Sequence, residues 1–165
     1  MAGSVICSTA PGGCPDPHVV NNRYQWSSAG AAPDGNAYTD FLATLNAGSF
    51  AGHADWRLPF ILEVQSIPVG SGVETVANAD PPDPNSGQNA TGQATTCAGP
   101  PCIDPGFAAV GGPTASSHYW SASSFATNPN FAWFAYFLNG KVFSLNASNK
   151  TLGLFVRAVR AGSCD

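Results

Sequence analysis

The sequence is poor in charge. Only 10% of its 165 residues are Asp, Glu, Lys or Arg, whereas about a quarter is usual for a soluble domain. The six Lys and Arg residues are scattered singly, and the formal net charge is −4. Nucleic acids and anionic membrane surfaces both call for a clustered basic patch. We therefore expect neither as a partner.

Long apolar runs and a visible export signal are also missing. The chain has no run of about 18 apolar residues, which excludes a membrane-spanning helix. Its start, MAGSVIC, has neither the basic region nor the apolar core of a signal peptide. Met-Ala-Gly-Ser resembles a cloning remnant, so an export signal could have been trimmed away. The 18 Gly and 14 Pro residues favour a loop-rich, extracellular β-type domain.

Five cysteines allow local and long-range disulfides. Cys97 and Cys102 are close enough in sequence to close a small disulfide ring, worth about 2 kcal/mol by chain-entropy arithmetic. They could instead be half of a zinc site, although no second Cys or His pair completes one. A bridge from Cys7 or Cys14 to Cys164 would tie the two ends together and leave one odd thiol. Such bridges would imply an oxidising compartment.

The order of elements predicts an α+β fold. Residues 18–28 are typical of short strands, and apolar residues at helical spacing predict an amphipathic helix from Asp34 to Gly48. A shorter helix after Pro59 carries Ile61, Val64 and Ile67 inward. A long irregular loop follows from Pro68 to Pro113, and antiparallel strands fill the chain from Tyr119 onward. We expect an N-terminal tail at 1–17 and a single domain at 18–165.

The segment 132–146, AWFAYFLNGKVFSLN, predicts a β-hairpin with a two-residue type I′ turn at Asn139-Gly140. That register would pair Phe137 with Val142 and sort the side chains into two sets. One set is Trp133, Ala135, Phe137, Val142, Ser144 and Asn146. The other set is Phe134, Tyr136, Leu138, Lys141, Phe143 and Leu145. Both are rich in large apolar residues, which is unusual for a hairpin with one face in water.

No catalytic or metal constellation is apparent in the sequence. His18, His53 and His118 are isolated from one another and from acidic clusters, so we expect no metal site built on them. The segment Asp80–Gly87 offers oxygen ligands for calcium without the EF-hand spacing, and turn formation is the simpler interpretation. Within Asp55–Pro59 (DWRLP), Trp56 and Leu58 should point inward, and Arg57 should fork onto a carboxylate or carbonyl groups.

Several short motifs in sequence order resemble one bacterial surface-domain family. They are Gly52–Pro59 (GHADWRLP), Glu63–Ile67 (EVQSI), Tyr119–Ser123 (YWSAS), Asn128–Trp133 (NPNFAW) and Phe155–Arg160 (FVRAVR). They resemble the C-terminal domain of the collagen-like bacterial adhesins (the Lcl C-terminal domain family).

The resemblance implies a C-type-lectin-like fold of the formylglycine-generating-enzyme branch, with two helices and with the terminal strands paired. Such pairing suits a bridge from Cys7 or Cys14 to Cys164. One departure is Phe60, where relatives often carry a polar capping residue, so the start of that helix should be bonded differently.

The resemblance does not carry every family property to this chain. The enzyme branch uses a reactive cysteine pair near its end, but Cys164 is the only cysteine in the last 60 residues here. We therefore expect no enzymatic activity and no cofactor. Adhesin relatives are associated with sulfated glycans, which want clustered Arg and Lys. Lys141 and Lys150 provide little positive charge, so the resemblance is weak support for sulfated-glycan binding by this chain.

The family-like Trp133 and Phe137 mark their face of the hairpin as the core. The predicted ligand-binding face is then Phe134, Tyr136, Leu138, Phe143 and Leu145, with Lys141, Ser148 and Thr151 at its rim. Three alternatives are considered for what covers this face: the chain's own long loop or another strand, a sister subunit, or a protein or glycan ligand.

The same fold also carries the variable proteins of diversity-generating retroelements, in which Asn codons near the C-terminus are rewritten. Between scaffold-like residues such as Trp133 and Lys150, the aromatic residues and most of their neighbours are of types that a randomised Asn codon can encode. Lys141, in the same stretch, is not of such a type. The sequence therefore predicts a non-enzymatic, exported bacterial binding domain at the cell surface.

Overall fold

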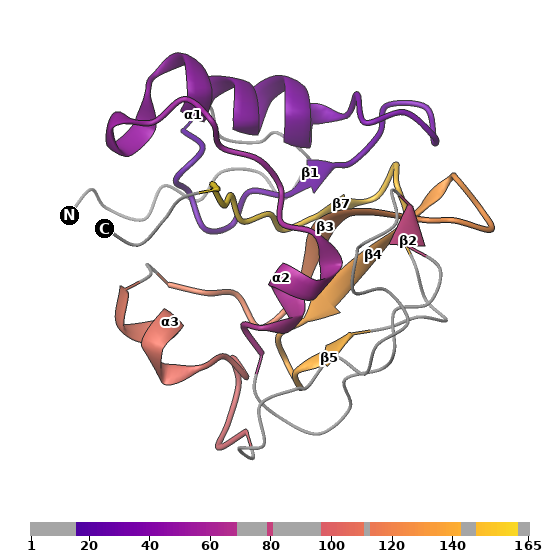
Figure 1. Ribbon diagram of the computed structural model, residues 1–165. Helices are drawn as coiled ribbons and strands as arrows, with labels where there is room; N and C mark the ends of the chain where they lie inside the picture. The colour runs from indigo at the N-terminus through magenta and orange to yellow at the C-terminus, as the bar shows by residue number, and fades with distance from the viewer. Residues whose placement is uncertain (1–15, 69–78, 81–96, 111–112, 143–147, 162–165) are drawn as a thin grey trace.

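The computed structural model describes residues 16–68, 79–80, 97–110, 113–142 and 148–161 (Figure 1). Most of the helical elements lie in the first half of the chain, and most of the strands lie in the second half. The helical elements are η1 (Ala37–Leu42, a π-helix), α1 (Ala43–Ala47), η2 (Phe50–Gly52, a 3₁₀-helix), α2 (Ile61–Gln65) and α3 (Pro105–Val110). The strands are β1 (Tyr24–Gln25), β2 (Ala79–Asp80), β3 (His118–Phe125), β4 (Phe131–Tyr136), β5 (Lys141–Val142), β6 (Ser148–Asn149) and β7 (Gly153–Leu154).

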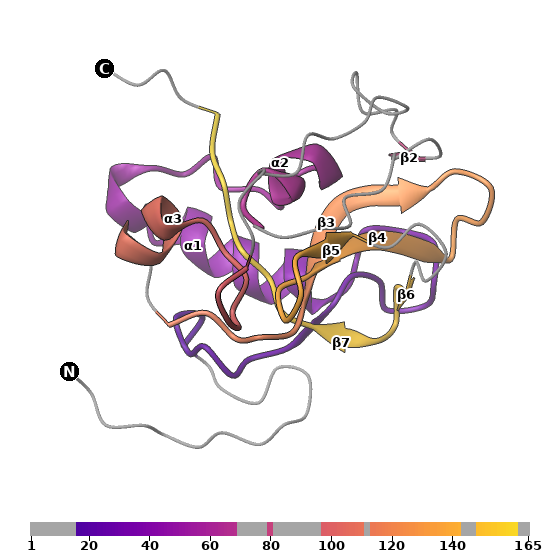
Figure 2. The ribbon, with the colours of Figure 1, turned by 90° about the horizontal axis from the view of Figure 1, so that it is seen from below.

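Antiparallel pairing builds two connected sheets. A five-stranded sheet has the order β2-β3-β4-β5, with β6 also paired to β4 (Figure 2), and a two-stranded sheet joins β1 to β7. The chain leaving β7 lies beside β3, because Phe155 donates its N–H to His118 O and accepts one from the N–H of Trp120. The α+β class predicted from the sequence is confirmed. The pairing of β1 with β7 also matches the pairing of terminal strands that the resemblance implied.

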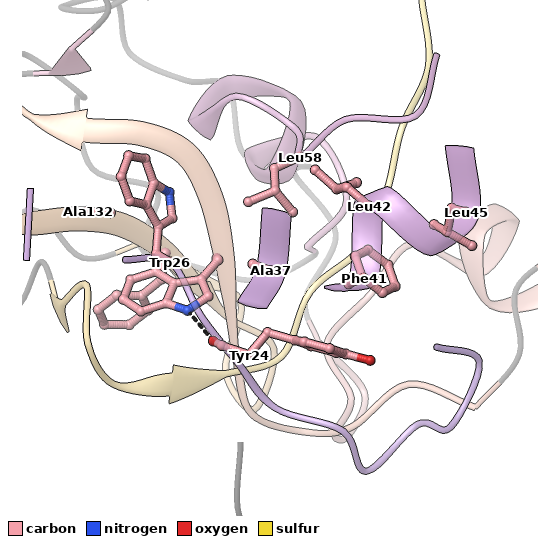
Figure 3. Packing of buried hydrophobic residues seen from close by; sticks show 10 residues of the cluster. Tyr24, Trp26, Ala37, Phe41, Leu42, Leu45, Leu58 and Ala132 are labelled. Atoms are coloured by element: carbon pink, nitrogen blue, oxygen red, sulfur yellow. Dashed lines mark hydrogen bonds between the residues drawn. The ribbon is translucent and has the colours of Figure 1, made fainter. Parts of the chain in front are cut away.

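Strand β4 is covered on both faces, and this decides where the core lies. Trp133 and Ala135 belong to one buried cluster, with Ile61 and Val64 from α2 and with Ile67, two residues beyond that helix. Phe134 belongs to a second cluster, built with Trp120 of β3 and apolar residues of the N-terminal half. Figure 3 shows members of this second cluster that come from β1, from η1 and α1, and from Leu58.

The first predicted helix is present. It runs through η1 and α1 and ends at Gly48, and it buries Ala37, Phe41, Leu42 and Leu45. Gly35 stands just before it because the chain passes very close to β1 there. An added Cβ at Gly35 would lie 2.2 Å from the carbonyl oxygen of Gln25. Any larger residue would therefore push this helix away from the strand it covers.

The second helix is also present, and its start is bonded in an unusual way. Phe60 precedes α2, and its side chain has no acceptor with which to cap the helix. Its backbone N–H donates to Glu63 Oε2 at 2.6 Å. The N–H of Ile61, the first residue of α2, donates to Ser123 Oγ on β3 at 3.1 Å, so another element satisfies one of the N–H groups that have no partner within the helix. The two terminal guanidinium nitrogens of Arg57 also donate to the carboxylate of Glu63, at 2.7 Å to Oε2 and 2.6 Å to Oε1. The structural interpretation of Arg57 is thus confirmed.

Other expectations about secondary structure were wrong. Helix α3 lies within the predicted irregular loop. The strand material at 18–28 is reduced to β1, and the ending 154–161 forms mostly isolated pairings. Within it, Val159 pairs with Arg57 and Phe155 pairs with Tyr119. These segments carry apolar side chains suited to a strand, but their backbone partners lie singly in loops and in β3, so no long ladder forms.

Candidate functional site

The hairpin of β4 and β5 has a longer loop than predicted. Ala135 pairs with Val142 and Tyr136 with Lys141, which leaves four loop residues, 137–140. A type I′ turn needs positive φ at both central residues, but only Gly140 adopts it, at 73°, and Asn139 does not. Phe137 is held elsewhere, since its N–H donates to Ser117 O and its carbonyl accepts from Cys102 N. The predicted turn was therefore wrong, although a two-residue shift leaves the alternation of faces unchanged.

Phe134 does not face outward. Its side chain is 3% exposed and packs in the second cluster, so its assignment to an exposed ligand-binding face was wrong. The physical reason is that β1, η1 and α1 supply a full apolar cover over this part of β4 (Figure 3). Of the three covers considered for this face, the chain's own covers Phe134. It comes from the N-terminal half and not from the long loop.

Tyr136 lies at the edge of that cover and stacks on His118. Their ring centroids are 4.1 Å apart with an interplanar angle of 7°, and His118 meets Phe134 edge-on at 4.9 Å. Both residues of the stack are half-buried. Burial, helped by the positive charge of Arg23, lowers the pKa of His118. The neutral imidazole and the phenol ring thus form a small uncharged aromatic surface next to the hairpin loop.

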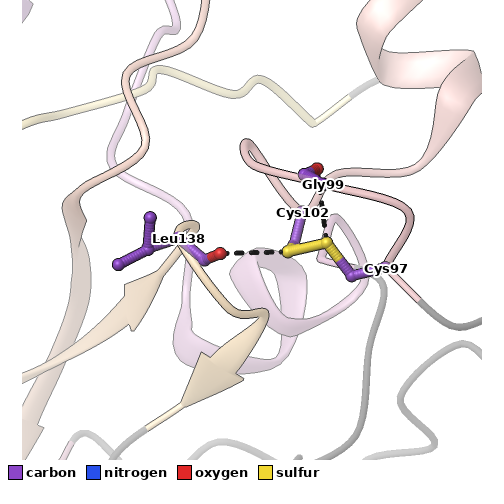
Figure 4. Close-up of a disulfide and its surroundings, with 4 residues drawn as sticks. All are labelled: Cys97, Gly99, Cys102 and Leu138. Carbon is purple, nitrogen blue, oxygen red and sulfur yellow. Dashed lines mark hydrogen bonds between the residues drawn. A yellow bond between two sulfur atoms is a disulfide. The ribbon is translucent and has the colours of Figure 1, made fainter.

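Leu138 lies in the hairpin loop, and its side chain is 41% exposed. Beside its carbonyl group lies the ring closed by the disulfide between Cys97 and Cys102 (Figure 4). Sγ of Cys102 is 3.1 Å from the carbonyl oxygen of Leu138. This is a close sulfur–oxygen contact and not a hydrogen bond, because a disulfide sulfur carries no proton. The predicted disulfide is confirmed over the zinc alternative. The ring supports the backbone of the loop and leaves the Leu138 side chain outside.

The other predicted site residues are divided between two places. Lys141 is the register partner of Tyr136 at the hairpin end, whereas Ser148 pairs with Ala132 near the start of β4. Thr151 follows β6, where its hydroxyl donates to Asn149 Oδ1 at 2.8 Å. Phe143 and Leu145 lie outside the described residues. The structure thus brings Tyr136, Leu138 and Lys141 together and places Ser148 and Thr151 at the far end of β4.

His118 was missed as a member of this site. The sequence presented it as an isolated histidine, and only its metal-binding capacity was considered. The available signal was the cross-strand register. Pairing Trp120 with Phe134 in an antiparallel ladder automatically sets His118 opposite Tyr136.

The part of the chain that the structure describes offers no metal centre. It contains no group of three His, Cys, Asp or Glu side chains able to hold an ion. His18 instead packs on Phe50, with ring centroids 4.7 Å apart. The calcium alternative at Asp80–Gly87 falls almost wholly outside the described residues. So do Cys7, Cys14 and Cys164 of the proposed terminal bridge.

Comparison with models of known protein families gives a match over most of the chain. A model of the Lcl C-terminal domain matches residues 14–160, which is most of the sequence. The chain belongs to the Lcl C-terminal domain family. Neither the curated proteins nor the solved structures gave a match to it. In this Lcl C-terminal domain, no helix of the described ranges is long and apolar enough to cross a membrane.

Proposed function

We propose that this Lcl C-terminal domain is a non-enzymatic ligand-binding domain of an exported bacterial protein, related to surface adhesins. Family membership supports the adhesin relationship, and the disulfide between Cys97 and Cys102 suits an oxidising compartment outside the cytosol. The binding site is the hairpin-end surface, which we define as His118, Tyr136 and Leu138; the backbone of Lys141 lies opposite Tyr136. The protein acts at the cell surface.

The observation that carries this proposal is the exposure of Leu138 beside the aromatic stack. Leu138 is 41% exposed at the tip of a loop held by a disulfide ring, and the Tyr136 ring already rests on His118. Aromatic rings with few rotatable bonds lose little conformational entropy when a partner covers them. Fully burying a leucine side chain contributes about 1.5–3 kcal/mol. A rigid, partly apolar surface of this kind favours a protein or glycan partner.

The fold and the origin of the surface are the finer parts of the proposal. We propose a C-type-lectin-like fold, supported by the pairing of β1 with β7. We also propose that the segment from Phe125 to Val156 is diversified by a retroelement, because many of its residue types fit a randomised Asn codon. The neighbouring DNA should then hold a near-copy of these codons that differs at adenines. Its absence from a complete genome would contradict diversification and leave ligand binding untouched.

A binding screen tests the site itself. The unaltered protein and a Tyr136→Ser plus Leu138→Ser variant are compared on a glycan array with neutral and sulfated oligosaccharides and against a displayed peptide library. Phe107→Ser is the matched control, because Phe107 is 38% exposed but lies outside the hairpin-end surface and outside the segment proposed to be diversified. We expect a partner that the double variant loses and the control keeps, with both variants melting as the unaltered protein does. Equal binding by all three proteins would exclude this surface.

Light scattering separates ligand binding from the rival role of an oligomerising surface module. If the unaltered protein is a stable oligomer and the double variant is a soluble monomer, the hairpin-end surface is a subunit contact. If both proteins are monomers, the surface is open to a ligand. Neutral or sulfated oligosaccharides that bind would identify the glycan-binding form of the adhesin role.

A further inference from the structure

We propose that a groove between the N-terminal segment and the end of the chain is a second binding site, which takes a small carboxylate with an apolar body. The groove has a volume of about 270 Å³ and is lined by residues of 17–24, by side chains from the first helix and η2, and by residues 155–158. None of the hairpin-end residues lines it, so this proposal does not depend on the proposed function.

An aromatic wall forms one part of the groove. His18 packs on Phe50, and Phe50 meets Trp56 with ring centroids 5.5 Å apart. Phe50 is 42% exposed, which is unusual for so large an apolar side chain. The indole N–H of Trp56 donates to Phe50 O at 3.0 Å and so holds the backbone of the exposed residue in place. The wall is mostly apolar, and Phe50 leaves part of it open to solvent.

The backbone that presents Phe50 is strained. Ser49 and Ala51, the residues on either side of it, have φ values of 46° and 53°, in the left-handed region. Non-glycine residues rarely adopt this conformation, and it costs about 1–2 kcal/mol per residue. Such strain persists where other contacts enforce it, and it gathers at binding and active sites. This second observation, independent of the cavity, points to Phe50 as a residue that contacts a ligand.

Arg157 supplies the charge that selects an anion. It carries the only fixed charge among the described lining residues. Neither ion pair between described residues involves it, although its side chain is half-buried. Its guanidinium donates to Thr114 Oγ1 and lies over the Tyr119 ring, with Cζ 5.7 Å from the centroid. A guanidinium has five N–H donors in a fork that matches a carboxylate, so donors are left for a ligand.

The size of the groove limits what the body of the ligand can be. An apolar cavity of about 150 Å³ is enough to hold a benzene ring. The groove therefore accommodates one phenyl ring or branched aliphatic group with a short arm ending in a carboxylate. Both a free aromatic acid and the C-terminal residue of a peptide present this chemistry. Larger ligands would have to extend into solvent.

The test follows the indole N–H signal of Trp56 by ¹H–¹⁵N NMR during titration with 3-phenylpropionate. The other three tryptophans are buried, at 4%, 0% and 1% exposure, so Trp56 is the reporter nearest to solvent. We expect a saturable shift with 3-phenylpropionate. The neutral isostere 3-phenylpropan-1-ol should bind at least about tenfold more weakly, because it lacks the charge-assisted hydrogen bonds to Arg157. This comparison needs no variant.

Variants locate the site. Phe50→Ser and Arg157→Gln should each weaken binding of 3-phenylpropionate by about tenfold or more, while Leu152→Ser should bind as the unaltered protein does. Arg157→Lys, which keeps the charge, serves if Arg157→Gln does not fold. Tighter binding of N-acetylphenylalanine would indicate a peptide C-terminus, and weaker binding would indicate a free acid. The proposal is overturned by the absence of a saturable shift, by equal affinity for acid and alcohol, or by unchanged affinity in a folded Arg157→Gln variant.

Discussion

The ammonium nitrogen of Lys150 lies 3.8 Å from the centre of the Trp26 ring. The lysine side chain is 1% exposed, and Nζ donates to Ala31 O at 2.9 Å and to Ser124 Oγ at 2.6 Å. The carbonyl of Lys150 also accepts the N–H groups of Trp26 and Ser27. A buried ammonium group is tolerated only when polar partners and aromatic faces replace its water. Lys150 therefore ties the segment after β1 to strand β3.

Replacing Lys150 by methionine should destabilise the fold strongly. The Lys150→Met variant keeps the volume and the apolar stem but loses the contacts of the ammonium group, and it leaves Ser124 Oγ and Ala31 O without that donor. We expect the free energy of unfolding to fall by about 2–4 kcal/mol, measured by urea denaturation. The matched control is Arg160→Met, because Arg160 is exposed and its 3.7 Å contact with Asp55 is a surface ion pair worth little. Equal stability of the two variants would show that Lys150 is not a structural link.

The ion pair between Arg57 and Glu63 predicts a pH dependence of stability. The hydrogen bonds from Arg57 hold the pKa of Glu63 below its ordinary value of 4.5. Its contribution is therefore present above pH 4.5 and is lost as the pH falls through the lower folded-state pKa. Both side chains are partly exposed, at 35% and 41%, so the contribution is about 1 kcal/mol or less. Glu63→Gln should be less stable than the unaltered protein at pH 7, and the difference should shrink below pH 4. A difference as large at pH 3 as at pH 7 would contradict this explanation.

The strain beside Phe50 predicts a stabilising substitution. Glycine adopts the left-handed conformation without a Cβ penalty, so Ala51→Gly should raise the free energy of unfolding by about 0.5–1 kcal/mol. Ala47→Gly is the control, because Ala47 lies in α1, where glycine costs about 1 kcal/mol. The two alanine-to-glycine changes should thus have opposite signs in thermal denaturation. If Ala51→Gly destabilises the protein as Ala47→Gly does, the backbone at Ala51 is not strained.

The stack of His118 on Tyr136 predicts a histidine that resists protonation. Burial lowers the pKa of His118 from its ordinary 6.5, and the charge of Arg23 adds to this effect. Because the folded-state pKa is the lower one, the contribution to stability is present above pH 6.5 and is lost as the pH falls below it. In an NMR titration of the imidazole signals, Arg23→Gln should raise the pKa of His118 partway toward 6.5. An unchanged or lower pKa would show that Arg23 does not act on His118.

Much of the secondary structure follows from local sequence pattern, and so does the sorting of the hairpin side chains into two faces. The spacing of Phe41, Leu42 and Leu45 predicts a helix wherever it docks. Alternation sorted the hairpin side chains into two sets, and the family resemblance correctly assigned the set with Trp133 and Phe137 to the core. The disulfide between Cys97 and Cys102 was predictable because the short segment between them contains Gly and Pro, which favour a turn that brings two cysteines close together. Helix α3 was missed because its Pro- and Gly-rich surroundings are typical of loops.

The candidate site depended on contacts that no local pattern contains. A strand that is apolar on both faces needs two covers, but the pattern does not say which segment provides each. Phe134 is buried by Tyr24, Trp26 and the first helix, about a hundred residues earlier in the chain, so the predicted five-residue face was reduced. The hairpin loop was likewise lengthened because Phe137 bonds to Ser117 and Cys102.

The sequence by itself determined the α+β class, the family, the two main helices, the local disulfide and the sorting of the β4 side chains into two faces, because each depends on composition, on short motifs or on near neighbours. The tertiary structure alone decided that Phe134 is buried, that Lys150 is an internal link, that His118 joins Tyr136, and that Phe50 and Arg157 line one groove. Each of these depends on contacts between residues distant in sequence, where the alternation of apolar and polar residues fixes a face but not its partner.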